Sequence, residues 1–282
     1  MKILLVGGDL RQGYCAKVLA QAGHSVYFWA CQEEIVAQLR HGKQLQKSEC
    51  AKGDVLLLPY PLSRDNTTVA GTKGAVSLSA IEAVLPAFRL VVGGGMPKSF
   101  LAKGPQLLDL SAQEDYTLSL AHITAEATLS LLFTHTKTTV DRLHIGLLGY
   151  GRIGRSLAQK CLSLGAKVTV FARGKEKPAL AVADGVHCVE GVCPEPDALS
   201  SLSVLVNTVP APVFPLPLFD SLPEDTLLIE LATGEQFPKN TGRPHLLGHG
   251  LPGKLLPKAA GEVLGQWILA NLPQNITTKD SL

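Results

Sequence analysis

Three glycines stand at the spacing G-x-G-x-x-G, which can hold the phosphates of a nucleotide. Gly149 allows a tight turn, Gly151 lets the backbone approach a pyrophosphate, and Gly154 lets a helix pack closely on a strand. An apolar run, residues 143–148, precedes the pattern, and residues 155–164 follow it at helical spacing. This strand-turn-helix context favours a dinucleotide site over a glycine-rich turn without a ligand. The residues predicted to bind the cofactor in this turn are Gly149, Tyr150, Gly151, Arg152, Ile153 and Gly154.

The end of the next predicted strand, residues 167–172, indicates which dinucleotide is bound. An NAD site usually has Asp or Glu there, about 20 residues past the first glycine, to bind the ribose 2′-hydroxyl. This chain has Arg173 and Lys175 instead. Because a guanidinium fork suits a phosphate, we predict NADP(H), the alternative being a solvated basic turn.

A later apolar run, residues 204–206, leads into a turn that contains Asn207, Thr208 and Pro210. In an open parallel sheet, ligands bind beyond the carboxyl ends of the strands. We therefore expect this turn to lie over the nicotinamide ribose.

The first predicted strand, residues 2–6, ends in a degenerate glycine turn at residues 7–9. Arg11 follows at the start of a helix, where a guanidinium suits a carboxylate ligand. The alternative is that Arg11 pairs with a nearby acid such as Asp9. Thr67 and Thr68 belong to a polar loop that leaves the carboxyl end of another predicted strand.

A long helical stretch, residues 117–136, carries one isolated carboxylate. Apart from histidines, Glu126 is the only acid or cation between Asp115 and Lys137. A carboxylate on a largely buried helix is costly unless it is paired or used. We therefore weigh a site role for Glu126 against a structural hydrogen bond or a solvent-facing position.

Predicted strands and helices alternate along the chain, so we expect an α/β fold with two doubly wound parallel-sheet domains. The first is an N-terminal α/β domain, residues 1–116, completed by a C-terminal return helix, residues 257–275. Residues 117–136 form a connecting helix. The second domain, residues 137–256, is an NAD(P)-binding Rossmann domain inserted between the two helices. Residues 251–256 are expected to be a link.

Composition excludes several other classes of protein. The 282 residues are 46% hydrophobic and 18% charged, which indicates a globular chain. A net charge of +2 with dispersed charges does not predict nucleic-acid binding, and no uncharged segment resembles a membrane span. Six cysteines without C-x-x-C spacing predict reduced thiols and no metal site. No signal peptide is recognisable, so we expect a cytoplasmic location.

Several blocks spread over the chain resemble the family formed by the A subunit of bacterial dipicolinate synthase. These blocks are residues 7–12, 124–126, 149–154, 206–210, 230–233, 250–253 and 257–258. The resemblance implies oxidation of dihydrodipicolinate to dipicolinate during sporulation, with NADP⁺ as acceptor. It also implies a location in the mother-cell cytoplasm and a flavoprotein-like second subunit; a homo-oligomer is expected as well.

The implied reaction removes a hydride from a ring carbon and a proton from its neighbour, and makes the ring aromatic. The protein then mainly has to hold a dicarboxylate in register with the nicotinamide. We expect the carboxylates to be held by Arg11, Thr67, Thr68, Thr124 and Lys258. The general base would be Glu126 or His249. We also expect Glu126 and Lys258 to line one pocket between the domains.

Two other functions fit the same architecture. A D-2-hydroxyacid dehydrogenase would need an Arg after the strand that ends near residues 230–233, but Gly234 and Glu235 follow instead. A non-catalytic NADP-binding regulatory subunit is also possible from the sequence, since no residue is an unmistakable catalyst.

Overall fold

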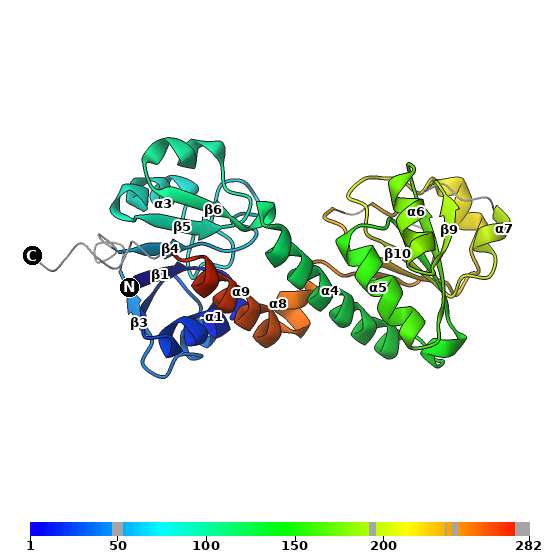
Figure 1. Ribbon diagram of the computed structural model, residues 1–282, viewed down its shortest axis with the longest axis horizontal. Helices are drawn as coiled ribbons and strands as arrows, with labels where there is room; N and C mark the ends of the chain where they lie inside the picture. The colour runs from blue at the N-terminus through cyan, green and yellow to red at the C-terminus, as the bar shows by residue number, and fades with distance from the viewer. Residues whose placement is uncertain (47–52, 192–195, 235, 239–241, 274–282) are drawn as a thin grey trace, which may run out of the picture. The chain divides into compact units, whose positions relative to one another are not determined.

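The computed structural model describes residues 1–46, 53–191, 196–234, 236–238 and 242–273. The chain divides into two units (Figure 1). Unit 1 comprises residues 1–120 and 256–282, and unit 2 comprises residues 121–255. The division falls within the long helix α4 (Glu114–His135). Residues 274 and 275 of the expected return helix lie outside the described residues.

Unit 1 is built on a parallel six-stranded sheet with the order β3-β2-β1-β4-β5-β6. Its strands are β1 (Lys2–Val6), β2 (Ser25–Trp29), β3 (Lys43–Leu45), β4 (Val55–Leu57), β5 (Leu90–Gly93) and β6 (Gln106–Asp109). Its α-helices are α1 (Leu10–Gln21), α2 (Glu33–Val36), α3 (Leu78–Val84), α9 (Pro257–Asn271) and the first turns of α4. Short 3₁₀ helices are η2 (Leu85–Ala87), η3 (Lys98–Lys103) and η4 (Leu110–Ala112).

Unit 2 contains a second parallel six-stranded sheet with the order β12-β11-β10-β7-β8-β9. Its strands are β7 (His144–Leu148), β8 (Lys167–Ala172), β9 (His187–Glu190), β10 (Val204–Asn207), β11 (Leu227–Glu230) and β12 (His245–Leu247). Its α-helices, besides the rest of α4, are α5 (Arg152–Ser163), α6 (Glu176–Ala183), α7 (Pro196–Leu199) and α8 (Leu251–Leu255). The 3₁₀ helices η5 (Val140–Arg142) and η6 (Leu216–Ser221) complete it.

The two sheets have the same topology. In each, the first and fourth strands of the unit are neighbours, and the chain winds outward from them in both directions. The strand order therefore reverses between β1 and β4 in unit 1 and between β7 and β10 in unit 2. In doubly wound folds this switch point, at the carboxyl ends of the strands, is where a ligand binds. The predicted α/β class with a Rossmann domain is confirmed.

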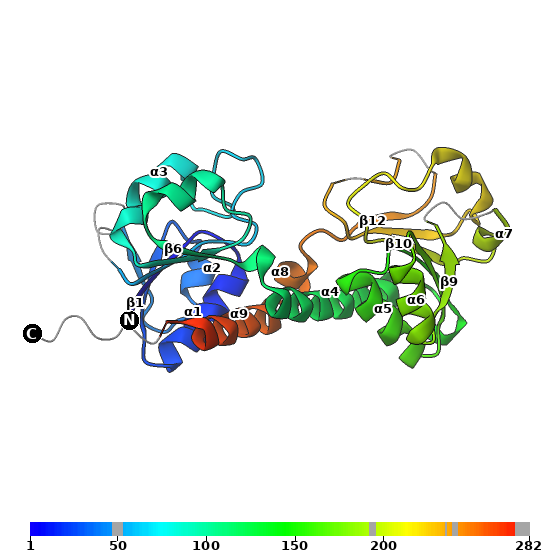
Figure 2. The same cartoon turned by 45° about the horizontal axis from the view of Figure 1, so that its top comes forward.

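The sheet of unit 1 is covered on both faces because its strands are apolar on both sides. Ile3 and Leu5 pack with residues of α1 and α9, whereas Leu4 and Val6 pack with Ile81 of α3. Figure 2 shows α3 on one face of the sheet and the α1–α9 pair on the other.

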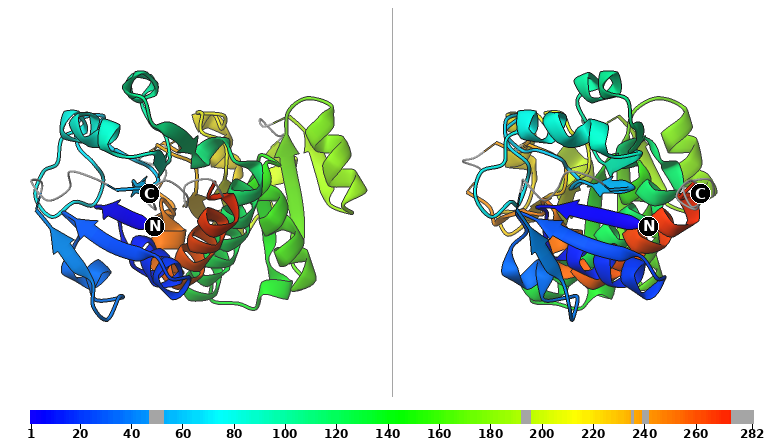
Figure 3. Two further views of the ribbon diagram at one scale, coloured as in Figure 1. Left: turned by 60° about the vertical axis from the view of Figure 1, so that its left-hand side comes forward. Right: turned by 90° about the vertical axis from the view of Figure 1, so that its left-hand side faces the viewer.

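Glycines allow α1 and α9 to pack at very short range. A Cβ at Gly261 would collide with the carbonyl oxygen of Arg11, and one at Gly265 would lie 2.7 Å from Cβ of Val18. The two helices therefore run in the same direction and begin at the same edge of the sheet (Figure 3). Within unit 1, the start of α9 lies beside the start of α1, at the carboxyl end of β1.

Residues 251–255 of the expected link form the short helix α8, which the sequence did not predict. Gly250, directly before α8, has the left-handed conformation (φ +70°) that favours glycine. Pro252 lies in the first turn of α8, where a helix tolerates proline. Leu251 and Pro252 are buried, which gives this short helix an anchored face.

No described helix is long and apolar enough to span a lipid bilayer.

Candidate functional site

The glycine turn between β7 and α5 has the conformation that its spacing predicts. Gly149 follows β7 with φ +92°, a left-handed conformation that favours glycine. A Cβ at Gly154 would lie 2.5 Å from the carbonyl oxygen of Gly149, so the helix can pack on the turn only with glycine there. A Cβ at Gly151 would meet no atom within 4 Å. The backbone at Gly151 therefore borders open space, which a phosphate could approach.

The start of α5 is suited to an anion. Gly151 is its N-cap residue and provides no side chain to cap the helix, and the first turn contains no acid. The N-terminus of a helix carries a partial positive charge that favours phosphate. The turn and the helix together fit the pyrophosphate of a dinucleotide.

Tyr150 anchors this turn from inside the protein. Its side chain is buried, and its hydroxyl donates to Oδ2 of Asp184 at 2.8 Å. Arg155 donates to both oxygens of the same carboxylate, at 2.7 and 2.9 Å. The hydrogen bonds from Arg155 and Tyr150 lower the pKa of Asp184, while burial and this acceptor raise the pKa of Tyr150. Only the backbone of Tyr150 remains to face a cofactor.

The turn after β10 is held by its own side chains. Asn207 is buried; its Nδ2 donates to the carbonyl of Val209 at 3.0 Å, and its Oδ1 accepts the Val209 N–H at 2.9 Å. Thr208 Oγ1 donates to the carbonyl of Leu148 at 2.8 Å. These bonds place the turn directly against Gly149, where a Cβ would lie 2.7 Å from Val209 Cγ2. Pro210 is exposed at the end of this turn.

Asn207 is itself held by Glu230, a residue to which the sequence patterns assigned no role in the site. Glu230 ends β11 directly opposite Asn207 in the strand register, and its Oε1 accepts Asn207 Nδ2 at 2.9 Å. Its side chain is 0% exposed. The sequence feature that could have indicated this role is an acid at the end of an otherwise apolar strand.

The cations after β8 lie on the other side of the switch point from the turn after β10. Arg173 and Lys175 are exposed and flank Gly174, which has φ +78°. Within the described ranges, no carboxylate forms a salt bridge with either cation. Both side chains are exposed beyond the end of β8, and their binding of a cofactor phosphate stays a prediction.

In unit 1, the equivalent glycine turn is closed by its own chain. Gly7 and Gly8 have φ +54° and +86°, but the Gly8 N–H donates to the carbonyl of Ala70 at 2.8 Å. Gly71 lies so close to Gly8 that no Cβ could fit. A phosphate therefore cannot approach this turn as it can approach Gly151.

Arg11 is engaged near that closed turn. It donates to Asp9 through Nε at 2.8 and 3.1 Å and through Nη2 at 2.8 Å, and Nη2 also donates to the carbonyl of Tyr60 at 2.9 Å. Burial opposes the ionisation of Asp9, but the hydrogen bonds and charge of Arg11 hold its pKa below the usual value. The structure thus contains the Asp9 pair that was the alternative for Arg11; a role toward substrate stays a prediction.

The polar loop with Thr67 and Thr68 is organised by Asp65. This carboxylate accepts both threonine N–H groups, at 2.8 and 2.7 Å, and the Thr68 hydroxyl at 2.6 Å. These bonds lower the pKa of Asp65. The loop borders a hollow of about 410 Å³ that also contains Arg64 and Thr72. Substrate binding by the two threonines stays a prediction.

Glu126 forms a surface ion pair within unit 2. It accepts Lys160 Nζ at 2.9 Å, and His122 Nε2 lies 3.5 Å away. The Glu126 side chain is 51% exposed, and the hydrogen bond from Lys160 lowers its pKa. Of the alternatives weighed for Glu126, the structure contains the solvent-facing position, with the carboxylate paired to Lys160 of α5. Its assignment as a base stays a prediction.

The other predicted substrate-end residues lie in different surroundings. Thr124 is buried on α4. Lys258 is exposed in the first turn of α9, with its Nζ 4.0 Å from Glu262 Oε1. His249 follows β12, and its Nε2 is buried without a hydrogen-bond partner among the described residues. Roles for these three in substrate binding or proton transfer stay predictions.

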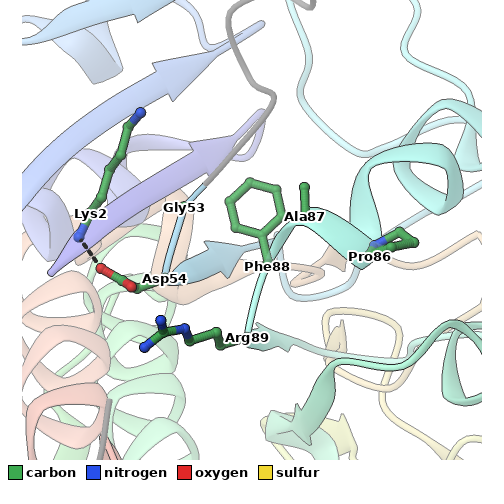
Figure 4. Close-up of a pocket in the computed structure, with 7 residues that line it drawn as sticks. All are labelled: Lys2, Gly53, Asp54, Pro86, Ala87, Phe88 and Arg89. Carbon is green, nitrogen blue, oxygen red and sulfur yellow. Dashed lines mark hydrogen bonds between the residues drawn. The ribbon is translucent and has the colours of Figure 1, made fainter. Parts of the chain in front are cut away.

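A second hollow, of about 360 Å³, lies at the opposite edge of the unit 1 sheet. Lys2, Asp54 and Arg89 stand at the amino ends of β1, β4 and β5, and the Lys2 N–H donates to Asp54 at 2.7 Å (Figure 4). Because ligands of doubly wound sheets bind at the carboxyl ends, this hollow is not the candidate site.

Comparison with known proteins agrees with the geometry of both units. Residues 2–103 match the family of the N-terminal domain of the dipicolinate synthase A subunit. Residues 144–234 match the family described as NADP oxidoreductase coenzyme F420-dependent. The dipicolinate synthase A subunit of Bacillus subtilis (strain 168) is 26% identical over 306 residues, which cover 99% of this chain and 98% of that protein. The chain resembles the A subunit of dipicolinate synthase.

Solved structures support the resemblance. The dipicolinate synthase A subunit from Bacillus halodurans superposes with a TM-score of 0.79 at 25% identity, covering 95% of this chain and 96% of that one. Its Bacillus subtilis counterpart has a TM-score of 0.78 at 24% identity, covering 98% and 96%. A D-lactate dehydrogenase from Treponema pallidum, at 12% identity and a TM-score of 0.60, covers 96% and 95% and shares the fold.

The two family matches fall in different units of the chain. The dipicolinate synthase match covers β1 to β5 and the closed turn of unit 1. The NADP oxidoreductase match begins at β7 and includes the open glycine turn, Asn207 and Glu230. The chain thus combines a dipicolinate-synthase-type unit with an oxidoreductase-type, NAD(P)-binding unit.

Proposed function

We propose that this chain is an NADP-dependent oxidoreductase that converts dihydrodipicolinate to dipicolinate. The observation that carries the proposal is the open glycine turn at Gly151, in a chain similar to the dipicolinate synthase A subunit along nearly its whole length. The turn supports binding of a dinucleotide, and the similarity to dipicolinate synthase supports the choice of substrate.

NADP⁺ is the proposed acceptor because the position after β8 is cationic. Arg173 and Lys175 stand where an NAD-binding chain presents a carboxylate to the ribose. Both are exposed, so they can reach a ribose phosphate without first breaking an ion pair to a described carboxylate. The guanidinium would bind that phosphate through paired hydrogen bonds.

The residues of this chain would orient the reactants and remove one proton. When bound, the nicotinamide would accept a hydride from one ring carbon of the substrate. A base of this chain, Glu126 or His249, would take the proton from the neighbouring carbon, which leaves an aromatic ring. Arg11, Thr67, Thr68, Thr124 and Lys258 are the proposed holders of the substrate carboxylates. Asn207, Thr208 and Pro210 would border the nicotinamide ribose.

The names of the relatives suggest the physiological setting. The Bacillus proteins carry the name of one lettered component of a synthase, which implies at least one other component. We propose that this chain acts with a flavoprotein-like second subunit in the mother-cell cytoplasm during sporulation, and that it forms a homo-oligomer.

A D-2-hydroxyacid dehydrogenase remains the alternative enzyme, since the D-lactate dehydrogenase above has the same fold. Such an enzyme would place an Arg after β11 to bind the substrate carboxylate. Residues 231–234 include no Arg, and Glu235 lies outside the described residues. A regulatory subunit that binds NADP without catalysis is the remaining alternative.

The purified chain, incubated with NADP⁺ and dihydrodipicolinate, separates the three functions. The proposal predicts formation of NADPH with dihydrodipicolinate and none with D-lactate. NADPH formation with D-lactate alone would favour the hydroxyacid dehydrogenase. NADPH binding without turnover, both with and without the second subunit, would favour the regulatory role.

A further inference from the structure

Glu230 is a buried acid that the proposed reaction does not use. Its Oε1 accepts Asn207 Nδ2 at 2.9 Å and the Ala232 N–H at 3.2 Å. Its Oε2 accepts the N–H groups of Gln236 at 3.1 Å and Phe237 at 3.2 Å. One carboxyl group therefore joins the turn after β10 to the segment that follows β11.

This hydrogen-bond pattern fits the ionised form of Glu230, whose two oxygens accept four N–H groups. Backbone N–H groups can only donate, and the Asn207 amide is oriented by the Val209 N–H, which donates to Oδ1. A protonated carboxyl group would give up an acceptor position to one of these donors. Burial raises the pKa of Glu230 above its usual value, and the four N–H donors offset part of this rise because they favour the carboxylate.

Neutral hydrogen-bond donors stabilise this charge without cancelling it. Among the residues that the structure describes, no Lys, Arg or His forms a salt bridge with Glu230. The side chain is 0% exposed, and β11 around it is apolar. Its field is therefore weakly screened by solvent and by protein charges.

The position of Glu230 in the sheet associates it with one half of the dinucleotide. The cations after β8 mark the adenosine side of the switch point, since that is where a ribose is recognised. The second nucleotide then lies across the switch point, over the carboxyl ends of β10 and β11. Asn207 and Glu230 end these two strands, opposite each other in the register.

We propose that the Glu230 carboxylate makes the nicotinamide end of this site prefer the oxidised cofactor over the reduced one. The oxidised nicotinamide ring is a cation and the reduced ring is neutral, so a nearby buried anion stabilises only the oxidised form. A unit charge acting through an effective dielectric constant of about 20 over roughly 10–15 Å changes the affinity ratio by about tenfold. The inference rests on the proposed NADP-binding function and favours substrate oxidation.

The test compares dissociation constants of NADP⁺ and NADPH, measured by calorimetric titration, for the wild-type chain, Glu230→Gln and Glu224→Gln. Glu224 is exposed near the amino end of the same strand, so its variant makes the same chemical change away from the site. Glu230→Gln should raise Kd(NADP⁺)/Kd(NADPH) about tenfold. Glu224→Gln should leave this ratio unchanged.

Glu230→Asp distinguishes charge from support. It keeps the negative charge but cannot reach all four N–H groups, so both dissociation constants should rise together while their ratio stays within about twofold. A Glu230→Gln variant that loses both affinities equally would show a support role only and overturn the inference. If Glu230→Gln does not fold, a shifted ratio in Glu230→Asp overturns the inference, and so does a wild-type chain that binds NADPH as tightly as NADP⁺. A constant ratio together with tighter binding of NADP⁺ by the wild-type chain upholds it. A wild-type chain that binds neither form would refute the proposed function itself.

Discussion

Gly149 and Gly154 are in contact across the turn between β7 and α5. The carbonyl oxygen of Gly149 lies 2.5 Å from the position that a Cβ of residue 154 would occupy. The intervening Gly151 has free space around the same atom position. The three glycines are thus required for different reasons: Gly149 for its backbone conformation, Gly154 for close packing, and Gly151 for space in which a phosphate could lie. Substitutions can separate these effects.

Gly154→Ala should destabilise the fold, whereas Gly151→Val should mainly weaken cofactor binding. An added methyl group at residue 154 collides with backbone and should cost about 1–3 kcal/mol in the free energy of unfolding. Val at residue 151 fits the extended backbone, with φ −85° and ψ −164°, but fills the space that a phosphate would use. We expect at least a tenfold loss of NADPH affinity there, with stability within about 1 kcal/mol of wild type. Urea unfolding and NADPH fluorescence measure the two effects. Unchanged NADPH affinity in Gly151→Val would contradict binding of a cofactor phosphate beside Gly151.

Arg173→Asp should weaken NADPH binding far more than NADH binding. A charge-assisted hydrogen bond to the ribose phosphate contributes about 1.5–3 kcal/mol, or roughly tenfold to hundredfold in affinity. Arg142→Asp is the matched control. Arg142 is exposed and precedes β7, so it lies at the amino ends of the strands of the same sheet, away from the proposed site. Fluorescence titration with both cofactors measures the preference. NADH binding as tight as NADPH binding in the wild-type chain would refute the proposed selectivity.

Arg11→Ala should lower kcat/KM for the dicarboxylate substrate about tenfold or more, if the guanidinium holds a carboxylate. NADPH affinity should stay near wild type, because Arg11 belongs to unit 1 and the glycine turn to unit 2. Arg89→Ala, at the amino edge of the same sheet, controls for the loss of one positive charge. Steady-state kinetics decide the matter. A parallel loss of NADPH affinity would show that Arg11 supports the cofactor or the fold instead.

Asp9→Asn should lower stability only above about pH 4. Because Arg11 holds the pKa of Asp9 below its usual value of 3.8, the ionised pair stabilises the folded state above that pH. The contribution is lost as pH falls through the lowered pKa. Asp9 is partly exposed, so we expect about 0.5–1 kcal/mol at neutral pH. Asn still caps α1, so the substitution isolates the charge. Urea unfolding between pH 7 and pH 3 should show the two curves converging; a constant difference would mean that the charge of Asp9 contributes nothing.

The fold was predictable because its signals are local. Each apolar strand of β1, β7 and β8 is followed by a glycine turn or a polar turn, and the G-x-G-x-x-G spacing lies within one turn. Edge strands β3 and β9 were not predicted, since both are short and half-exposed and show no clear apolar pattern. Helix α6, which begins within the basic turn at residues 173–177, was also not predicted.

The site was less predictable because its partners are distant in the sequence. The expected place of Asn207 beside the cofactor stays a prediction, but its hydrogen bond to Glu230, 23 residues further on, was not predicted. Glu126 seemed isolated along its own helix, but Lys160, 34 residues away, pairs with it. The sequence around Asn207 or Glu126 does not specify which side chain of another element will be its hydrogen-bond partner. Arg11 differs, since Asp9 is two residues away and the pair was foreseeable.

We propose above that this chain oxidises dihydrodipicolinate with NADP⁺ bound at the glycine turn of unit 2. The most direct measurement is a single-turnover reaction with excess enzyme, following NADPH by absorbance and dipicolinate by chromatography, in the wild-type chain and in Gly151→Val. We expect equal amounts of NADPH and dipicolinate from the wild-type chain and at least tenfold slower formation of both in the variant. Dipicolinate formed without NADPH, or at the same rate in Gly151→Val, would contradict it.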